Sequence, residues 1–304
     1  MTIITLQNKI TQKRITIQLI WIKMTTREND IAESFTGDRM SILNEIAART
    51  KERIAEEKFK VPLRELILQQ NSDLAKHAEE KISFLEALKK PGMSYICEVK
   101  KASPSKGLIA PDFPYLDIAK EYEQAGASAI SCLTEPFYFQ GADRYLQEIS
   151  QAVNIPVLRK DFTVDEYMLY QAKAFGASAV LLICAILDNS QLKAFGELAQ
   201  ELGMDALVEA HDQWEVDRAL KLGAKIVGVN NRNLHDFTVD MGNSIRLRNM
   251  APADTVFVSE SGIKTAEDIR ILYENKVDAV LIGETLMRSP DKKAALGALN
   301  AGIV

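Results

Sequence analysis

Charged residues stand at the ends of short apolar segments along this chain. The first such segment ends in Glu98-Val99-Lys100, and others end near Lys160, Glu209 and Glu260. The full set of residues placed in this way is Glu98, Lys100, Lys160, Glu209, Arg232 and Glu260. Three cations and three carboxylates in one place shift each other's pKa values and supply both acids and bases. The pattern predicts an acid–base active site, and the alternative for any single residue is a structural ion pair.

The spacing of the apolar segments predicts a fold that brings their ends together. Eight β-branched segments alternate with amphipathic helical segments, which is the pattern of repeated βα units. The predicted strands are Tyr95–Val99, Ala129–Leu133, Val157–Arg159, Ala179–Ile183, Ala206–Val208, Ile226–Val229, Val256–Val258 and Ala279–Ile282. We therefore predict an α/β fold, a (β/α)8 TIM barrel whose site lies at the carboxyl ends of its strands. An open eight-stranded sheet is the alternative.

Helix signals divide the chain further. Helices are expected at Met40–Glu57 and Pro62–Leu68, and Thr163 with Glu166 predicts a capping box at a later helix. We predict one domain over residues 40–304, with 40–91 as a helical cap and 92–304 as the barrel. Residues 1–39 are expected to be a disordered tail, or a stretch upstream of the true start at Met40. Their deletion is then expected to leave turnover and melting temperature nearly unchanged.

Two further groups of residues predict how a ligand is bound. Glycines follow the seventh and eighth strands at Ser261-Gly262 and Gly283-Glu284, where barrels often hold phosphate through backbone N–H groups. Apolar residues beside the charges are expected to form a slot for an aromatic ring. These apolar residues are Pro104, Phe139, Phe162 and Leu182.

Composition excludes several classes of protein. The formal net charge of −5 gives no reason to expect nucleic-acid or membrane partners, and no segment is apolar enough to span a bilayer. The three cysteines lie in separate apolar segments and the three histidines do not cluster with them, so we predict neither disulfides nor a metal site. We expect a cytoplasmic monomer that acts on a phosphorylated small molecule without a cofactor.

Seven motifs, in order from about Met40 to the C-terminus, resemble indole-3-glycerol phosphate synthases. They are Glu98-Val-Lys-Lys-Ala-Ser-Pro-Ser-Lys-Gly107, Leu133-Thr-Glu135 with Tyr138-Phe-Gln-Gly141, Leu158-Arg-Lys-Asp-Phe162, Leu207-Val-Glu-Ala210, Gly228-Val-Asn-Asn-Arg-Asn-Leu234, Val258-Ser-Glu-Ser-Gly262 and Leu281-Ile-Gly283. The resemblance implies decarboxylating, dehydrating ring closure of 1-(2-carboxyphenylamino)-1-deoxyribulose 5-phosphate, a step of tryptophan biosynthesis. The segment 40–91 resembles the helical cap of this family, and residues 1–39 have no counterpart.

The resemblance also implies a role for each site residue. Lys160 corresponds to the general acid at the ketone oxygen, Glu209 to the group at the developing hydroxyl and amine, and Lys100 with Glu98 to a pair used in dehydration and binding. The implied substrate-orienting residues are Asn230, Arg232, Glu260 and Ser261, and those at the anthranilate end are Ser103 and Phe139. Glu284 stands where the family often has serine, so its carboxylate is expected either to leave a backbone contact intact or to repel the phosphate.

Three other functions are consistent with parts of this pattern. Lys160 at a strand end suits the Schiff base of a class I aldolase, which borohydride trapping would detect. An isomerase of phosphoribosyl anthranilate would need a Cys/Asp pair where this chain has Glu98 and Lys100. A barrel that only binds a phosphorylated ligand would not need the full set of charges.

Overall fold

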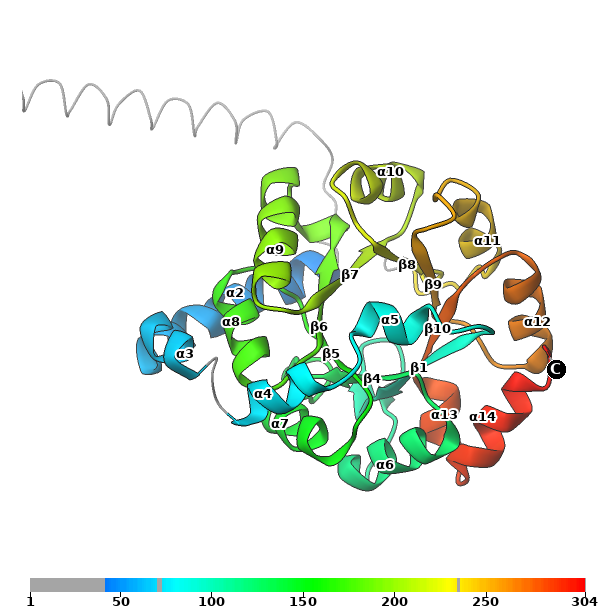
Figure 1. The fold of residues 1–304 in the computed structure, drawn as a ribbon, viewed down its shortest axis with the longest axis horizontal. Coiled ribbons are helices and arrows are strands. Elements are labelled where there is room, and N and C mark those ends of the chain that lie inside the picture. The colour runs from blue at the N-terminus through cyan, green and yellow to red at the C-terminus, as the bar shows by residue number, and fades with distance from the viewer. Residues whose placement is uncertain (1–41, 70–72, 234–235, 304) are drawn as a thin grey trace, which may run out of the picture. The chain divides into compact units, whose positions relative to one another are not determined.

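A closed barrel of eight parallel strands forms the centre of the computed structural model, which describes residues 42–69, 73–233 and 236–303 (Figure 1). The barrel strands are β1 (Ser94–Val99), β4 (Ala129–Leu133), β5 (Val157–Lys160), β6 (Ala179–Ile183), β7 (Asp205–Ala210), β8 (Ile226–Asn230), β9 (Val256–Glu260) and β10 (Ala279–Ile282). Since β1 pairs with both β4 and β10, the sheet has no edge. The predicted (β/α)8 barrel is confirmed, and the open sheet is excluded.

Helices follow each strand and cover the outside of the barrel (Figure 1). They are α6 (Tyr115–Ala125), α7 (Asp143–Ala152), α8 (Tyr167–Ala174), α9 (Asn189–Glu201), α10 (Gln213–Lys221), α11 (Gly242–Arg248), α12 (Ala266–Glu274), α13 (Glu284–Arg288) and α14 (Lys292–Asn300), with a short 3-10 turn η1 (Cys184–Ile186) after β6. A small hairpin, β2 (Ala102–Ser103) with β3 (Gly107–Leu108), follows β1. No helix in the described part of the chain is long and apolar enough to cross a membrane.

The strands extend further at their carboxyl ends than the apolar pattern predicts. β5 continues to Lys160, β8 to Asn230 and β9 to Glu260. Polar residues interrupt the apolar signal, but backbone pairing continues through them, as in the match of Asn230 with Glu260. The predicted strands therefore end one or two residues too early, at the point where the polar and charged side chains begin.

The predicted capping box of Thr163 and Glu166 is wrong. Helix α8 begins only at Tyr167, and Glu166 has helical torsion angles and no side-chain capping bond. Asp165 accepts from the Tyr167 N–H at 2.9 Å instead, so the helix start moves three residues along the chain. Capping boxes occur at α9, with Asp188 and Gln191, and at α12, with Thr265 and Asp268.

Two apolar layers hold the barrel together. The outer layer fills the space between the strands and helices α6–α14, and the inner layer fills the barrel itself. The inner layer includes Ile96, Ala129, Leu158, Ala179, Leu207, Ile226, Val256 and Ala279, most of them near the amino ends of their strands. Side chains alternate in direction along a strand, so each continuous apolar strand serves both layers.

The helices before β1 lie at both ends of the barrel. They are α2 (Ile42–Lys60), α3 (Leu63–Gln69), α4 (Asp73–Glu80) and α5 (Phe84–Leu88), and α2 and α3 match the two predicted helices. Helix α5 places Phe84 and Leu88 in the inner layer, and the Leu85 N–H donates to Asp205 at the start of β7, 2.8 Å away. Figure 1 looks onto this amino end, which α5 crosses.

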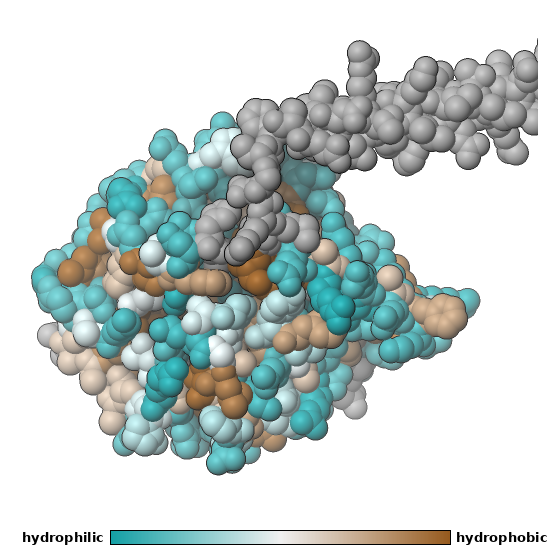
Figure 2. All heavy atoms as spheres, turned by 180° about the vertical axis from the view of Figure 1, so that it is seen from behind, coloured by the Kyte–Doolittle hydropathy of each residue, from teal (hydrophilic) through white to brown (hydrophobic). Residues whose placement is uncertain are grey.

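Helix α2 lies at the other end, where its residues line the mouth of the barrel. The predicted cap over residues 40–91 therefore consists of helices with different positions, and its functional role stays a prediction. Met40 and the predicted extension over residues 1–39 lie outside the described residues. On the face seen in Figure 2, apolar side chains form small groups separated by hydrophilic ones.

Candidate active site

A cavity of about 870 Å³ lies at the carboxyl ends of the strands. The structure brings together in its wall all but one of the site residues expected from sequence. They are Glu98, Lys100, Ser103, Pro104, Phe139, Lys160, Phe162, Glu209, Asn230, Arg232, Glu260, Ser261, Gly262, Gly283 and Glu284. Residues from every part of the barrel therefore meet in one place, as the (β/α)8 fold requires.

Leu182 is the exception and must be corrected. It is fully buried in the outer layer, whereas its neighbours Leu181 and Ile183 line the cavity. The register explains the difference, because Ile183 pairs with Glu209 and Leu182 pairs with Val208. Paired residues of neighbouring strands point to the same side of the sheet, so Leu182 points away from the mouth.

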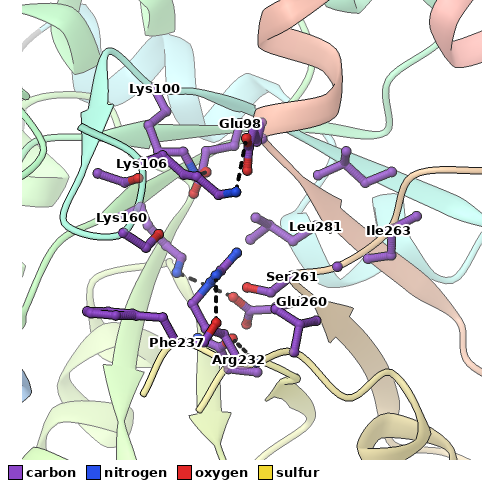
Figure 3. A pocket seen from close by; sticks show the side chains of 18 of the residues that line it. Glu98, Lys100, Lys106, Lys160, Arg232, Phe237, Glu260, Ser261, Ile263 and Leu281 are labelled. Atoms are coloured by element: carbon purple, nitrogen blue, oxygen red, sulfur yellow. Dashed lines mark hydrogen bonds and ion pairs between the residues drawn. The ribbon is translucent and has the colours of Figure 1, made fainter. Parts of the chain in front are cut away.

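Lys160 is the centre of the charged group. Its Nζ lies 3.2 Å from Glu209 Oε2 and 3.3 Å from Glu260 Oε2. Figure 3 shows the side chains of Lys160 and Glu260 pointing toward one another. Burial would lower the pKa of Lys160, but the nearby carboxylates of Glu260, Glu209 and Glu98 outweigh burial and raise the pKa. Lys160 is therefore held as an ammonium ion.

The two carboxylates beside Lys160 differ from each other. Burial would raise the pKa of Glu209, but Lys160 and His211 outweigh burial and lower it, so Glu209 is ionised. Burial raises the pKa of Glu260 to about 7. The charge of Lys160 offsets this rise only in part, and the negative charge of Glu209 adds to it. Pairs of acids whose environments separate their pKa values are typical of acid–base active sites.

Glu98 and Lys100 form a second buried ion pair at the end of β1 (Figure 3). Glycine makes room for it, because a Cβ at Gly283 would overlap with the Glu98 carboxylate and lie 2.8 Å from Lys100 Nζ. Gly228 in β8 does the same for Glu260, whose carboxylate would overlap with a Cβ there. Both ion-paired groups thus occupy space that only glycine leaves open.

A buried network fixes the segment that follows Lys160. Asp161 accepts two bonds from the Arg53 guanidinium of α2, at 2.9 and 3.0 Å, and one from the Thr134 hydroxyl at 2.6 Å. It also accepts from the Phe162 N–H at 2.8 Å. Burial would raise the pKa of Asp161, but Arg53 and Arg159 outweigh burial and lower it. Helix α2 is therefore bonded to the residue next to Lys160.

Lys106 and Lys264 also line the cavity, and sequence reasoning did not single them out. Glu284, at the start of α13, is paired with Arg288 at 3.1 Å and with Lys106 at 3.6 Å. The carboxylate of Glu284 is thus partly neutralised on the protein side.

Backbone geometry at the end of β9 is unusual. Ser261 and Gly262 have consecutive positive φ values of 68° and 90°, which only glycine adopts freely. A Cβ on Gly262 would lie 2.5 Å from Val239 Cγ1. Both strain and contact therefore require glycine at 262.

One side of the cavity is lined by apolar residues. The rings of Phe139 and Phe162 are 6.2 Å apart, and Ile42, Leu43 and Ile46 of α2 line the same cavity. These residues provide flat apolar surfaces suited to an aromatic ring. In the described part of the chain, no group of three or more His, Cys, Asp or Glu side chains is arranged to hold a metal ion.

A closed barrel of parallel strands with buried acids and bases at its carboxyl end defines an enzyme of the (β/α)8 class. The family model for indole-3-glycerol phosphate synthase matches residues 43–299. The chain belongs to the indole-3-glycerol phosphate synthase family, whose members are decarboxylating lyases of tryptophan biosynthesis.

Curated relatives agree over most of the chain. It is 56% identical to the indole-3-glycerol phosphate synthase of Endomicrobium trichonymphae over 252 residues, which are 82% of this chain and 95% of the relative. It is 54% identical to that of Ruminiclostridium cellulolyticum over 258 residues, 85% of this chain and 98% of the relative. Among solved structures, a 3-hexulose-6-phosphate synthase shares the fold with a TM-score of 0.58 and 16% identity, covering 70% of this chain and 100% of that one.

Proposed function

We propose that this enzyme closes the pyrrole ring of 1-(2-carboxyphenylamino)-1-deoxyribulose 5-phosphate, releasing carbon dioxide and water to give indole-3-glycerol phosphate. The observation that carries the proposal is Lys160, a buried ammonium ion between Glu209 and Glu260 at the bottom of a cavity with one apolar and one cationic side. Such a site suits a substrate that has an aromatic ring at one end and a phosphate at the other.

Lys160 is the proposed general acid in ring closure. Attack of the carboxylated ring carbon on the ketone places negative charge on the ketone oxygen, which the Lys160 ammonium stabilises. An alkoxide is more basic than an amine, so the proton passes to the oxygen even though the carboxylates raise the pKa of Lys160. The carboxylate then leaves as carbon dioxide, and its bonding electrons restore the aromatic ring.

Dehydration is assigned to the remaining acids and bases. The hydroxyl needs a proton in order to leave as water, and the neighbouring carbon must lose one to complete the indole. Glu209 is proposed to act at the hydroxyl and amine, and the Glu98–Lys100 pair to assist dehydration and to hold the charged ends of the substrate. The burial of all three side chains supports these roles, because it strengthens their interaction with developing charge.

Binding of the substrate is divided among several elements. Phe139, Phe162 and Ser103 are proposed to hold the anthranilate ring, while Asn230, Arg232, Glu260 and Ser261 orient the sugar chain. The phosphate is proposed to lie near the backbone of Gly262 and of residues 283–284, with Lys106 as a nearby cation. The pairing of Glu284 with Arg288 and Lys106 weakens the repulsion that its carboxylate would exert on the phosphate.

The aldolase alternative fits this site less well. A Schiff base requires the neutral amine of Lys160, whereas the surrounding carboxylates keep Lys160 protonated. The Glu98–Lys100 pair likewise differs from the Cys/Asp pair of the isomerase alternative. We also propose that the enzyme acts as a monomer in the cytoplasm. Its three buried, unpaired cysteines support the reducing compartment.

A fluorescence assay with the purified full chain tests the proposed reaction. Incubation with 1-(2-carboxyphenylamino)-1-deoxyribulose 5-phosphate should produce the emission of an indole together with one equivalent of carbon dioxide. The same chain should release no product from phosphoribosyl anthranilate. Borohydride added with 1-(2-carboxyphenylamino)-1-deoxyribulose 5-phosphate should not attach this substrate covalently to the chain. Absence of indole emission with an intact barrel would remove the proposed function.

A further inference from the structure

The proposed reaction takes up more protons than it releases within the site. Ring closure gives one proton to the ketone oxygen, and the resulting hydroxyl takes a second one as it leaves as water. The neighbouring carbon returns only one proton, and the substrate's ionised carboxylate leaves as carbon dioxide without any. Each turnover therefore consumes one proton, which must reach the buried Lys160–Glu209 pair from solvent.

A second cavity of about 460 Å³ lies beside the first. It shares Leu43, Asn230, Arg232 and Asp240 with the mouth cavity, but Lys160 and Glu209 do not line it. Its own residues include His211 and Glu215, which do not line the mouth cavity. The side chains of Asp240 and Arg246 at its rim are 64% and 62% exposed, so this cavity reaches solvent.

His211 stands between the two cavities. Its Nε2 is buried, has no well-aligned hydrogen bond within the described residues, and lies 3.4 Å from Glu209 Oε1. Its Nδ1 lies 3.0 Å from Glu215 Oε2. Together with the Lys160–Glu209 contact of 3.2 Å, this makes a continuous series of proton carriers, Glu215, His211, Glu209 and Lys160.

Glu215 itself is fixed in place. It accepts from the His211 backbone N–H at 2.8 Å, and it is held near the start of α10, where its own N–H donates to Asp212. Asn243 of α11 donates to the His211 carbonyl oxygen at 2.9 Å. Glu215 thus holds the imidazole in the orientation that directs Nε2 at Glu209, and Glu215 and Asn243 fix the His211 backbone.

Most of the charged groups around His211 are carboxylates, which favour its protonated form, whereas two arginines oppose it. They are Glu209 of β7, Asp212 beside α10, Glu215 of α10, Glu260 of β9, and at the second cavity Arg232, Asp240 and Arg246. Burial would lower the pKa of His211, but the bond to Glu215 and the charges of Glu209 and Glu260 outweigh burial and raise it. An imidazolium that titrates above its ordinary range is a suitable proton donor near neutral pH.

We infer that His211, held by Glu215, delivers the solvent proton that each turnover consumes, passing it from the second cavity to Glu209. This inference rests on the proposed function, because only a decarboxylating ring closure creates the proton deficit. His211 acts through Glu209 and does not touch the substrate cavity, so it is a positioning and proton-supplying residue. A proton moves from Nε2 to Glu209 Oε1, and solvent then reprotonates the imidazole.

The test is the variant His211→Gln, assayed for indole formation in a dilute, bulky buffer. Turnover should fall about tenfold, less than the ~10²–10⁴-fold contribution of direct acid–base catalysis, while KM stays within about twofold. Added imidazole should restore the lost turnover in a saturable manner, since it can enter the second cavity and replace the missing side chain. Wild-type turnover should decline as pH rises through the His211 pKa, and this decline should be absent from the variant.

Two further variants complete the design. Glu215→Gln keeps an oxygen for the His211 N–H but loses the charge that raises the His211 pKa. It should show a smaller loss of turnover, and its decline with rising pH should begin at a lower pH than in wild type. His77→Gln is the matched control, because His77 lies on α4 and lines neither cavity. This variant should behave as wild type at every imidazole concentration.

A turnover of His211→Gln equal to wild type at all pH values would overturn the relay, and so would a loss that imidazole leaves unchanged. If His211→Gln does not fold, Glu215→Gln decides, and a turnover and pH profile equal to wild type in that variant would overturn the relay. Failure of the wild-type chain to form indole would instead refute the proposed function, and the relay with it.

Discussion

The two ends of the barrel interior differ in the kind of side chain that they bury. At the amino end, α5 closes the barrel with Phe84 and Leu88, packed among apolar side chains. At the carboxyl end, the interior holds Lys160 with Glu209 and Glu260 at 3.2 and 3.3 Å from its Nζ. Burial of apolar area stabilises the fold, whereas burial of ion pairs often contributes nothing or destabilises it. The amino end is therefore expected to supply stability, and the carboxyl end chemistry.

The strongest test of this division is Lys160→Ala. Loss of the general acid should reduce turnover by about 10²–10⁴-fold. The barrel should still fold, because Glu209 and Glu260 can take up protons once their cation is removed. Steady-state kinetics and circular dichroism measure the two effects. Lys173→Ala is a matched control, since Lys173 is also buried and paired with one glutamate, 2.6 Å away, but lies outside the cavity. Near-normal turnover of a folded Lys160→Ala would contradict the assignment.

The opposite end is tested by Phe84→Ala. Removing this fully buried ring should lower the free energy of unfolding by about 3–5 kcal/mol, because it leaves a cavity in the inner layer. Turnover per folded molecule should not change. Urea denaturation gives the first quantity and an assay below the transition gives the second. Phe59→Ala is the control, since Phe59 is 91% exposed and its loss should cost less than about 0.5 kcal/mol. If Phe84→Ala also lost turnover per folded molecule, the two ends of the barrel would not be independent.

The smallest effect is expected at Gly283. From sequence alone, a Cβ here should mainly weaken phosphate binding, but the structure places it against Glu98 and Lys100. Gly283→Ala should therefore lower turnover, by about 10–100-fold, in addition to raising KM, since small displacements of reacting groups are costly. Gly196→Ala in α9 is the control, because a Cβ there meets nothing within 4 Å. A change in KM alone would favour the original expectation.

Sequence predicted the barrel well because every strand contains a short apolar segment that lies between helix signals. The one error among the site residues concerns the direction of a side chain and not its location along the chain. In a strand that is apolar on both faces, nothing in the pattern shows which residues point inward, and so Leu182 was chosen instead of Leu181 and Ile183. The pairing of Ile183 with Glu209 settles this, and it is a long-range property.

Two other features depend on contacts that no local pattern contains. His211 follows Glu209 by two residues, and its position between two cavities emerges only when α10 and α11 pack around it. The placement of α5 at the amino end depends on Leu85 meeting Asp205, 120 residues away. Charged residues after apolar segments, in contrast, were a local signal, and these charged side chains line the cavity.

The bond between Arg53 and Asp161 has a consequence for biosynthesis. The two residues are 108 positions apart, so a ribosome adding ~5–20 residues per second makes Arg53 about 5–20 s before its carboxylate partner. Until β5 and Asp161 have emerged, the Arg53 guanidinium and the apolar side chains of α2 lack these partners on the nascent chain. Docking of α2 onto the mouth of the barrel is thus delayed until about half of the chain has been made, and during this interval its apolar side chains are open to a chaperone.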